Sequence, residues 1–193
     1  MAKKITTTIR DIADKMILFA DENEVTEIQD LINFIFTQIE NNILTNSITI
    51  HNFFSLEIKK RKGYNGQFYI DCNVSKTFKK LIKDTTIEED NHNIISFGQL
   101  DSYCHEYDVE FFGTFFEKAK TLQYSEKIKF YYCFITKVFN VIKNLVINNN
   151  TFSTNFGYFS LKYNKIYGYY MNFKNNDIFK SNINEHFNKI LTT

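Results

Sequence analysis

The stretch that decides the fold is His51-Asn52-Phe53-Phe54-Ser55-Leu56-Glu57-Ile58-Lys59, because a similar stretch returns 103 residues later as Thr154-Asn155-Phe156-Gly157-Tyr158-Phe159-Ser160-Leu161-Lys162. A long helical pattern precedes each copy, a second strand follows it, and a lysine-bearing helical pattern closes it. Beyond the second strand the copies realign at a spacing of 101 residues, where Cys72 corresponds to Phe173. A repeat at this spacing predicts two copies of one small unit, so the chain has to be interpreted as a pair.

Hydrophobic periodicity predicts the same order of elements in each copy. In the first copy we expect helices over 6–20 and 24–41, strands over 47–61 and 67–73, and a closing helix over 75–83. In the second copy we expect helices over 108–120 and 125–148, strands over 151–164 and 167–174, and a closing helix over 176–191. The interval 84–107 carries six acidic side chains and no Lys or Arg, which predicts a partly extended, solvated linker. The predicted organisation is therefore a first unit over 1–83, an acidic linker over 84–107 and a second unit over 108–193.

This order of elements resembles the HU and integration host factor (IHF) family of bacterial architectural proteins. The second copy matches best: residues 155–159 fit the family's Gly-Phe-Gly-x-Phe signature, and its closing pattern is matched by Phe173, Asn176, Phe179, Lys180 and Ile183. The first copy keeps the central Phe53 and the apolar-and-lysine pattern of 72–82. The resemblance implies an α+β fold of two HU/IHF-like units, each a helical pair, a short-armed β-hairpin and a closing helix. A lone unit of this family cannot bury its hydrophobic face, so the units are expected to pair within one chain or with other chains.

The features with which this family bends DNA are missing from the sequence. Family members use long β-arms, each tipped by a proline that wedges between base pairs. Here residues 62–67 leave room only for a turn, and the chain contains no proline. Phosphate neutralisation supplies much of the affinity of DNA-binding proteins, yet this chain has a net charge of +1. The first unit carries 12 basic and 10 acidic groups, the linker 0 and 6, and the second unit 11 and 6.

Two short stretches are candidate binding surfaces. The run Lys59-Lys60-Arg61-Lys62 could contact phosphates, or it could be a solvated strand end that prevents edge-to-edge aggregation. The second hairpin is aromatic and mildly basic, and its candidate interface residues are Tyr163, Tyr167, Tyr169, Tyr170 and Phe173. Such rings could stack on bases, but aromatic hairpin faces more often bury against a protein. We therefore favour a protein partner for this hairpin.

No catalytic constellation is apparent, so we predict a protein that is not an enzyme and has no cofactor or metal. Cys104 and His105 with His92 and Asp101 could be drawn as a metal cluster, but adjacent residues on an extended segment point to opposite sides. Three cysteines at no metal-binding spacing fit a reducing compartment. The polar start of the chain predicts no signal peptide, and apolar runs interrupted by charge predict no membrane span.

A proline-free chain rich in Asn and Phe with tandem HU-like units also resembles the IHF-like proteins that crAss-like bacteriophages encode near their tail genes. This resemblance implies a structural protein of the phage virion, a subunit of a head-tail, neck or tail ring. Its partners would be other virion proteins, such as portal or tail components, and copies of itself, with nucleic-acid binding weak or absent. The alternative is a DNA-binding architectural, histone-like protein in the host cytoplasm. Fold analogy favours the alternative, whereas the missing arm, missing proline and neutral charge favour the virion protein.

Overall fold

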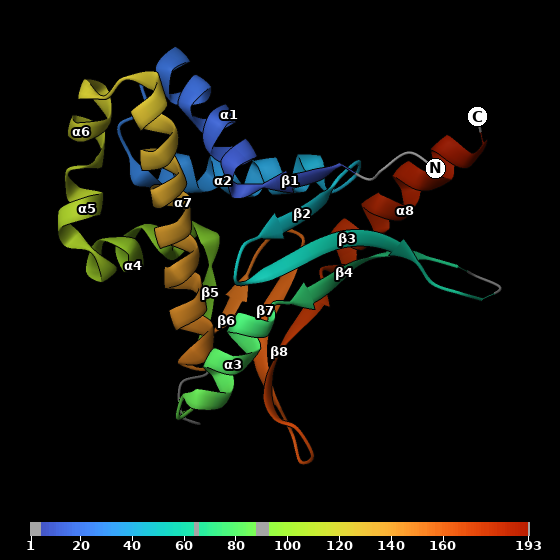
Figure 1. Cartoon of the computed structure of the whole chain (residues 1–193). Helices are drawn as coiled ribbons and strands as arrows, with labels where there is room; N and C mark the ends of the chain where they lie inside the picture. The colour runs from blue at the N-terminus through green and yellow to red at the C-terminus, as the bar shows by residue number, and fades with distance from the viewer. Residues whose placement is uncertain (1–4, 64–65, 88–92, 193) are drawn as a thin grey trace.

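The computed structural model describes residues 5–63, 66–87 and 93–192, and it confirms the predicted α+β fold class (Figure 1). Within these residues the strands form two four-stranded sheets. The first sheet contains β1 (Thr6–Thr8), β2 (Ser47–Ile50), β3 (Phe54–Lys60) and β4 (Phe68–Val74). The second contains β5 (Ile94–Ser96), β6 (Thr151–Ser153), β7 (Gly157–Asn164) and β8 (Gly168–Asn175). In both sheets the first strand runs parallel to the second and the remaining pairs are antiparallel, so the sequence repeat is also a repeat of topology.

The helices occupy corresponding places in the two halves. In the first half α1 (Ile9–Glu22) and α2 (Ile28–Asn42) connect β1 to β2, and α3 (Lys76–Asp84) follows β4. In the second half β5 and β6 are connected by η1 (Phe97–Gln99), α4 (Leu100–Tyr107), α5 (Val109–Gly113), α6 (Phe115–Thr121) and α7 (Tyr124–Ile147). Helix α8 (Asp177–Thr192) follows β8. The closing helices begin alike: the Ser75 hydroxyl accepts the Phe78 N–H at 3.1 Å, and the Asn176 amide oxygen accepts the Phe179 N–H at 3.0 Å.

The extended linker predicted for 84–107 is wrong over residues 94–107. These residues form β5, η1 and α4, and β5 adds to the edge of the second sheet by pairing in parallel with β6. The reason is a set of apolar side chains that the acidic composition obscured: Ile95, Leu100 and Cys104 are buried, while Glu106 stays exposed. Residues 88–92 lie outside the described residues. The single helix predicted over 108–120 is likewise two short helices, α5 and α6, which meet at Thr114.

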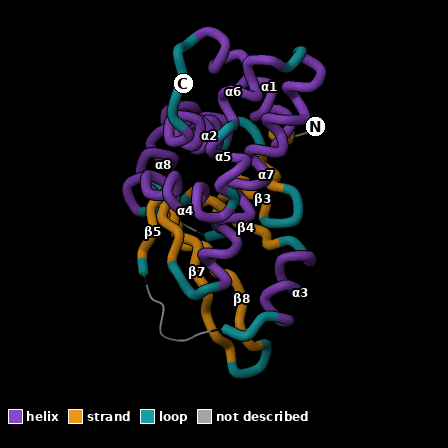
Figure 2. The backbone as a smooth tube through the Cα atoms, turned by 90° about the vertical axis from the view of Figure 1, so that its left-hand side faces the viewer, coloured by secondary structure: helices purple, strands orange, loops and turns teal. Residues whose placement is uncertain are grey.

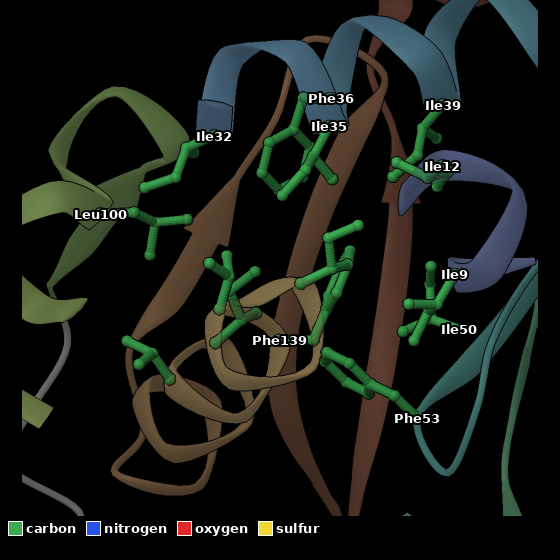
Figure 3. Packing of buried hydrophobic residues seen from close by; sticks show 14 of the residues in the cluster. Ile9, Ile12, Ile32, Ile35, Phe36, Ile39, Ile50, Phe53, Leu100 and Phe139 are labelled. Carbon is green, nitrogen blue, oxygen red and sulfur yellow. The ribbon is translucent and has the colours of Figure 1, made fainter. Parts of the chain in front are cut away.

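One hydrophobic core is built from both halves of the chain. The predicted apolar stripes of α2 and α7 are confirmed, since Leu31, Ile35 and Ile135 are fully buried. Side chains of α2 point toward α7, and the rings of Phe36 and Phe139 meet with centroids 6.3 Å apart (Figure 3). Helix α7 lies along α1. By length and composition α7 could cross a membrane, but 56% of its apolar window is buried inside the molecule, as in the core helix of a globular protein.

The closing helix of each half packs against the sheet of the other half. Helix α3 lies against β8, and α8 lies against β4. Figures 1 and 2 show α3 beside the β7–β8 hairpin from two directions. Because of this exchange the two halves interlock within one chain. The residues that lie beside the β4 edge and the β8 edge come in each case from the other half.

Candidate functional site

The basic run on the β3–β4 hairpin is largely engaged by its own hairpin. The Lys59 ammonium group is 2.9 Å from an Asp71 carboxylate oxygen and 3.4 Å from a Glu57 carboxylate oxygen, and the hydrogen bond to Asp71 raises the pKa of Lys59. Lys60 lies over the Phe68 ring at 5.6 Å, and Arg61 lies over the Tyr69 ring at 5.5 Å. Lys62 is exposed in the turn. The partners place Lys59 and Arg61 on one face of the hairpin and Lys60 on the other. Three of the four cations therefore already have intramolecular partners.

The β7–β8 hairpin leaves the body in a different direction from the β3–β4 hairpin (Figure 1). Its tip is apolar and exposed: the exposed fractions are 64% for Tyr163, 81% for Ile166 and 75% for Tyr167. Tyr170 is 41% exposed, and Tyr169 is half-buried with its ring 5.1 Å from that of Tyr163. The sequence interpretation overlooked Ile166, although its place beside the turn could have indicated it.

Phe173 differs from the other predicted interface residues because it packs against the core and is partly buried. Its side chain points inward, where its ring lies 4.9 Å from the Phe159 ring and 6.2 Å from the Phe156 ring. This inward packing is possible because Gly157 leaves room on the neighbouring strand. The exposed aromatic surface of the hairpin therefore ends before Phe173.

The outer edge of β4 is closed by two asparagine side chains from the second half. Arg61 donates its N–H to the Gln67 carbonyl, so the backbone groups of residue 67 face β3. Successive residues of a strand direct their N–H and C=O groups to alternate sides. The backbone groups of residues 68 and 70 therefore point away from β3. The Asn184 amide accepts the Phe68 N–H at 2.7 Å and donates to the Phe68 carbonyl at 2.9 Å. The Asn175 amide does the same for Ile70 at 2.8 and 3.0 Å. Each carboxamide thus replaces one residue of a neighbouring strand.

An aromatic side chain completes this contact. The Phe187 ring from α8 stacks on the Phe68 ring, with centroids 4.6 Å apart and an interplanar angle of 20°. Helix α8 reaches this position because it continues for 16 residues, whereas α3 has 9. The edge of β4 is therefore closed by hydrogen bonds and by ring stacking.

At the corresponding edge of β8, the described part of the chain supplies neither kind of contact. Asn176 donates its N–H to Phe156, so the alternation directs the N–H groups of Tyr169 and Met171 outward. By the 101-residue correspondence, Lys83 stands where Asn184 would be and Val74 where Asn175 would be. Neither side chain can both donate to and accept from one backbone residue. Helix α3 ends at Asp84 and supplies no counterpart of Phe187.

A pocket of about 510 Å³ opens at this edge, between α3, the end of β4 and the β7–β8 hairpin. Ile82, Met171, Val74 and Cys72 give it an apolar lining, and burial raises the pKa of the Cys72 thiol to about 12. Tyrosines 167, 169 and 170 line the hairpin side, and lysines 79 and 83 line the helix side. This pocket cannot be recognised in the sequence, because its lining residues lie about 100 positions apart.

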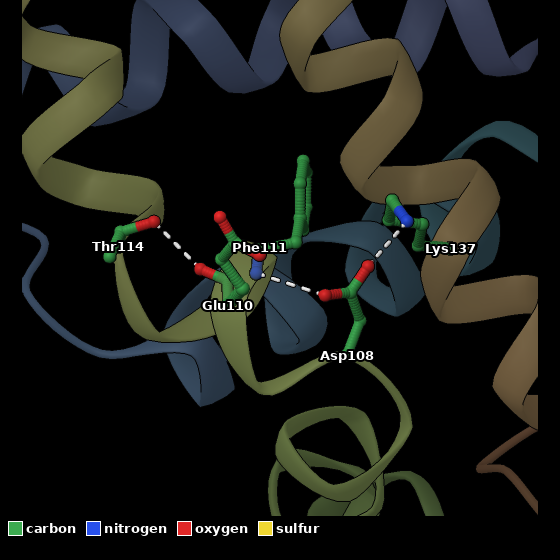
Figure 4. A network of polar contacts seen from close by, with 5 residues as sticks. All are labelled: Asp108, Glu110, Phe111, Thr114 and Lys137. Carbon is green, nitrogen blue, oxygen red and sulfur yellow. Dashed lines mark hydrogen bonds and ion pairs between the residues drawn. The ribbon is translucent and has the colours of Figure 1, made fainter.

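A second polar cluster joins α5 to α7 (Figure 4). Asp108 accepts the Phe111 N–H at 3.0 Å, which caps α5, and its other carboxylate oxygen lies 2.7 Å from the Lys137 ammonium group. These contacts lower the pKa of Asp108, with the Lys137 hydrogen bond as the largest cause, and the same bond raises the pKa of Lys137. Both groups are held by each other and by the helix end, so we assign them a structural role.

The cysteine and histidine residues are arranged differently from the cluster considered in sequence. Residues 101–105 lie on a helix, not on an extended segment, so His105 and Asp101 share a face and approach to 3.1 Å. Cys104 points into the core, and burial raises the pKa of its thiol to about 12. His92 lies outside the described residues. Among the described residues, no group of three or more His, Cys, Asp or Glu side chains could hold a metal ion.

Comparison with known proteins adds no identification. No protein-family model, no curated protein and no solved structure matches this chain.

Proposed function

We propose that this chain is a non-enzymatic structural protein that acts through protein–protein contacts of its β7–β8 hairpin. The observation that carries the proposal is the projecting hairpin tip, where Tyr163, Ile166 and Tyr167 are each more than 60% exposed. Large apolar side chains gathered at one projecting site favour burial against a partner. The pairing of the two halves already satisfies the core, so the hairpin tip is available for an external contact.

The particular role we propose is that of a phage virion subunit in a head-tail, neck or tail ring, built from two HU/IHF-like units without long arms. The repeated strand order and the exchanged closing helices support the HU/IHF-like part. The helical pair before the antiparallel strands is present in the first half, whereas η1 and α4–α7 take its place in the second. The virion part rests on the resemblance of the sequence. Its partners would be portal or tail components and further copies of the chain.

An architectural DNA-binding role is less well supported. Of the four cations in the basic run, Lys59 is paired with two carboxylates, and Lys60 and Arg61 lie over aromatic rings. The chain has a net charge of +1 and no proline. With about three to four phosphates neutralised, DNA affinity would have a log–log salt slope of about −3. Strong kinking of duplex DNA at nanomolar protein and physiological salt would favour the architectural role instead.

The test of the virion role is the copy number of the chain in purified particles, measured by quantitative mass spectrometry. We expect wild type in many copies and the double variant Ile166→Ser, Tyr167→Ala reduced more than tenfold, since interface anchors contribute about 2 kcal/mol or more each. Ile178→Ser is the matched control, because Ile178 is 74% exposed but lies on α8. Normal copy number of the double variant would remove the hairpin from the interface. Wild-type chain found only on intracellular DNA would refute the structural role.

A further inference from the structure

We propose that the pocket between α3 and β8 binds an acidic segment of a partner protein, which places an aromatic side chain against Tyr169. This inference deepens the proposed function, on which it rests, by naming the chemistry of the partner. The pocket shares only Tyr167 with the three apolar residues of the hairpin tip. Substitutions of Lys79, Lys83 and Val74 therefore test the pocket without changing the tip. Three observations carry it: the charge of the pocket, its open strand edge, and the occupant of the matching position on β4.

The charge of the pocket selects an acidic partner. Lys79 and Lys83 line it, and none of its lining residues among 5–63, 66–87 and 93–192 is Asp or Glu. Lys76 and Lys80 extend the positive charge along the same helix, and Lys162 lies on the neighbouring hairpin. None of these five lysines forms an ion pair with another described residue. Complementary charge across an interface selects partners and speeds their encounter, so carboxylates are the expected counterpart.

The β4 edge shows what completes such a site. There a carboxamide from Asn184 satisfies the N–H and C=O of Phe68, and the Phe187 ring, three residues further along the helix, stacks on the Phe68 ring. Tyr169 corresponds to Phe68 in the second half, but its outward backbone groups and its ring have no equivalent contact from α3. The occupant inferred for the pocket is therefore a segment with an amide side chain and an aromatic side chain three residues apart.

A protein segment fits these features better than a nucleic acid does. The pocket is lined at its helix and strand sides by Ile82, Met171 and Val74, which suit an apolar side chain. The net charge of the chain is only +1, which gives little general attraction for a polyphosphate backbone. The pocket volume, about 510 Å³, is large enough to receive an aromatic side chain with its neighbours.

The probe is a fluorescein-labelled, glutamate-rich helical peptide of 14 residues that carries one Asn and, three residues later, one Phe. Its binding to the full chain is measured by fluorescence anisotropy. We expect saturable binding that weakens roughly tenfold or more with Lys79→Glu, Lys83→Glu, because like charges then face each other. The matched control is Lys76→Glu, Lys80→Glu, which makes the same charge change on the same helix outside the pocket lining and should weaken binding clearly less, because these lysines act only at longer range. A peptide with Ser in place of Phe should also bind roughly tenfold more weakly.

Val74→Asn keeps the charge and tests the strand edge. It restores the residue type found at position 175, so its carboxamide can cover the edge of β8 and compete with the partner. We expect weaker peptide binding and an unchanged or higher melting temperature. A folded variant with undiminished binding would contradict the role of this edge, as would equal loss of binding in both lysine pairs.

The other occupants give different results. Tighter pocket-dependent binding of a 20-nucleotide single-stranded DNA than of the peptide would overturn the protein assignment. Self-association of wild type in sedimentation velocity that Lys79→Glu, Lys83→Glu abolishes would identify a second copy and overturn an external partner. No peptide binding at millimolar concentration refutes the inference. If the hairpin-tip variant still fails to enter particles in that case, the proposed function stands without it.

Discussion

Gly157→Ala should destabilise the protein strongly, because a methyl group at this position has no space. A Cβ placed on Gly157 would lie 2.3 Å from Cζ and 2.4 Å from Cε2 of the Phe173 ring, and 2.7 Å from the Lys174 carbonyl oxygen. Carbon atoms pack best at about 3.5–4.0 Å, so the overlap with the ring exceeds about 1 Å. The ring cannot move freely, since it packs against Phe159 at 4.9 Å. We expect a loss near the upper end of the overpacking range, about 1–3 kcal/mol.

The assay is urea unfolding followed by far-ultraviolet circular dichroism, with equal m-values as the condition for comparing free energies. Phe173→Leu removes the clashing ring atoms at a cost of its own, about 1–2 kcal/mol. The two losses should not add: Gly157→Ala with Phe173→Leu should be about 1 kcal/mol more stable than the sum of the two single losses predicts. It should remain less stable than wild type, because the added Cβ still meets the Lys174 carbonyl oxygen. Gly113→Ala is the matched control, because nothing lies within 4 Å of its added Cβ. Equal stability of the two alanine variants, or an additive double variant, would refute the packing argument.

Three further changes test the core, the strand edge and the polar cluster. Ile135→Asp places an unpaired charge at a fully buried position, so it should cost roughly 3–5 kcal/mol; a variant that melts like wild type would contradict the assignment of α7 to the core. Asn184→Ala leaves both outward backbone groups of Phe68 without their partner, with an expected cost of about 1–3 kcal/mol and faster amide hydrogen exchange at Phe68; unchanged exchange would argue against edge closure. Lys137 holds the pKa of Asp108 below its ordinary value of 3.8. The ion pair therefore stabilises the fold above pH 3.8, and this stabilisation is lost as the pH falls through the lower pKa of the folded state. Acid titration of Asp108→Asn should show a smaller loss of stability in that pH range, and an identical acid profile would count against the ion pair.

The elements that the sequence predicted well are those with a long periodic signal. The stripes of α2 and α7 repeat over four or more turns, so their apolar faces could be recognised without knowing what covers them. The closing helices have capping residues, Ser75 and Asn176, at their starts. The antiparallel strands β2–β4 and β6–β8 were predicted by comparing one half with the other. The repeated motif strengthens a strand pattern that is too weak in either copy alone.

The elements that were missed depend on partners far away in the chain. Strand β5 has three residues, and it is a strand only because it pairs in parallel with β6, which follows η1 and helices α4 to α7. Acidic composition suggested a solvated linker there, but the buried side chains of Ile95 and Leu100 outweigh it. Phe173 was assigned to an interface because its strand is aromatic, and its inward position follows from a glycine on the neighbouring strand. None of these facts can be obtained from a local window.

The difference between the two halves follows from a few exchanged residues and the length of one helix. In the first half the large side chain is that of Phe54, and its diagonal neighbour on β4 is Cys72. In the second half Gly157 takes the place of Phe54, and the large side chain is that of its diagonal neighbour Phe173. The ring centroids of Phe54 and Phe173 each lie 4.9 Å from that of Phe159. Each half thus contributes one ring to the packing around Phe159 in the shared core. At the strand edges, the residues that differ between the halves do not compensate for one another in this way. Asn175 and Asn184 close β4, whereas their counterparts leave β8 open. The duplicated fold thereby has one strand edge that the described residues of the chain do not complete.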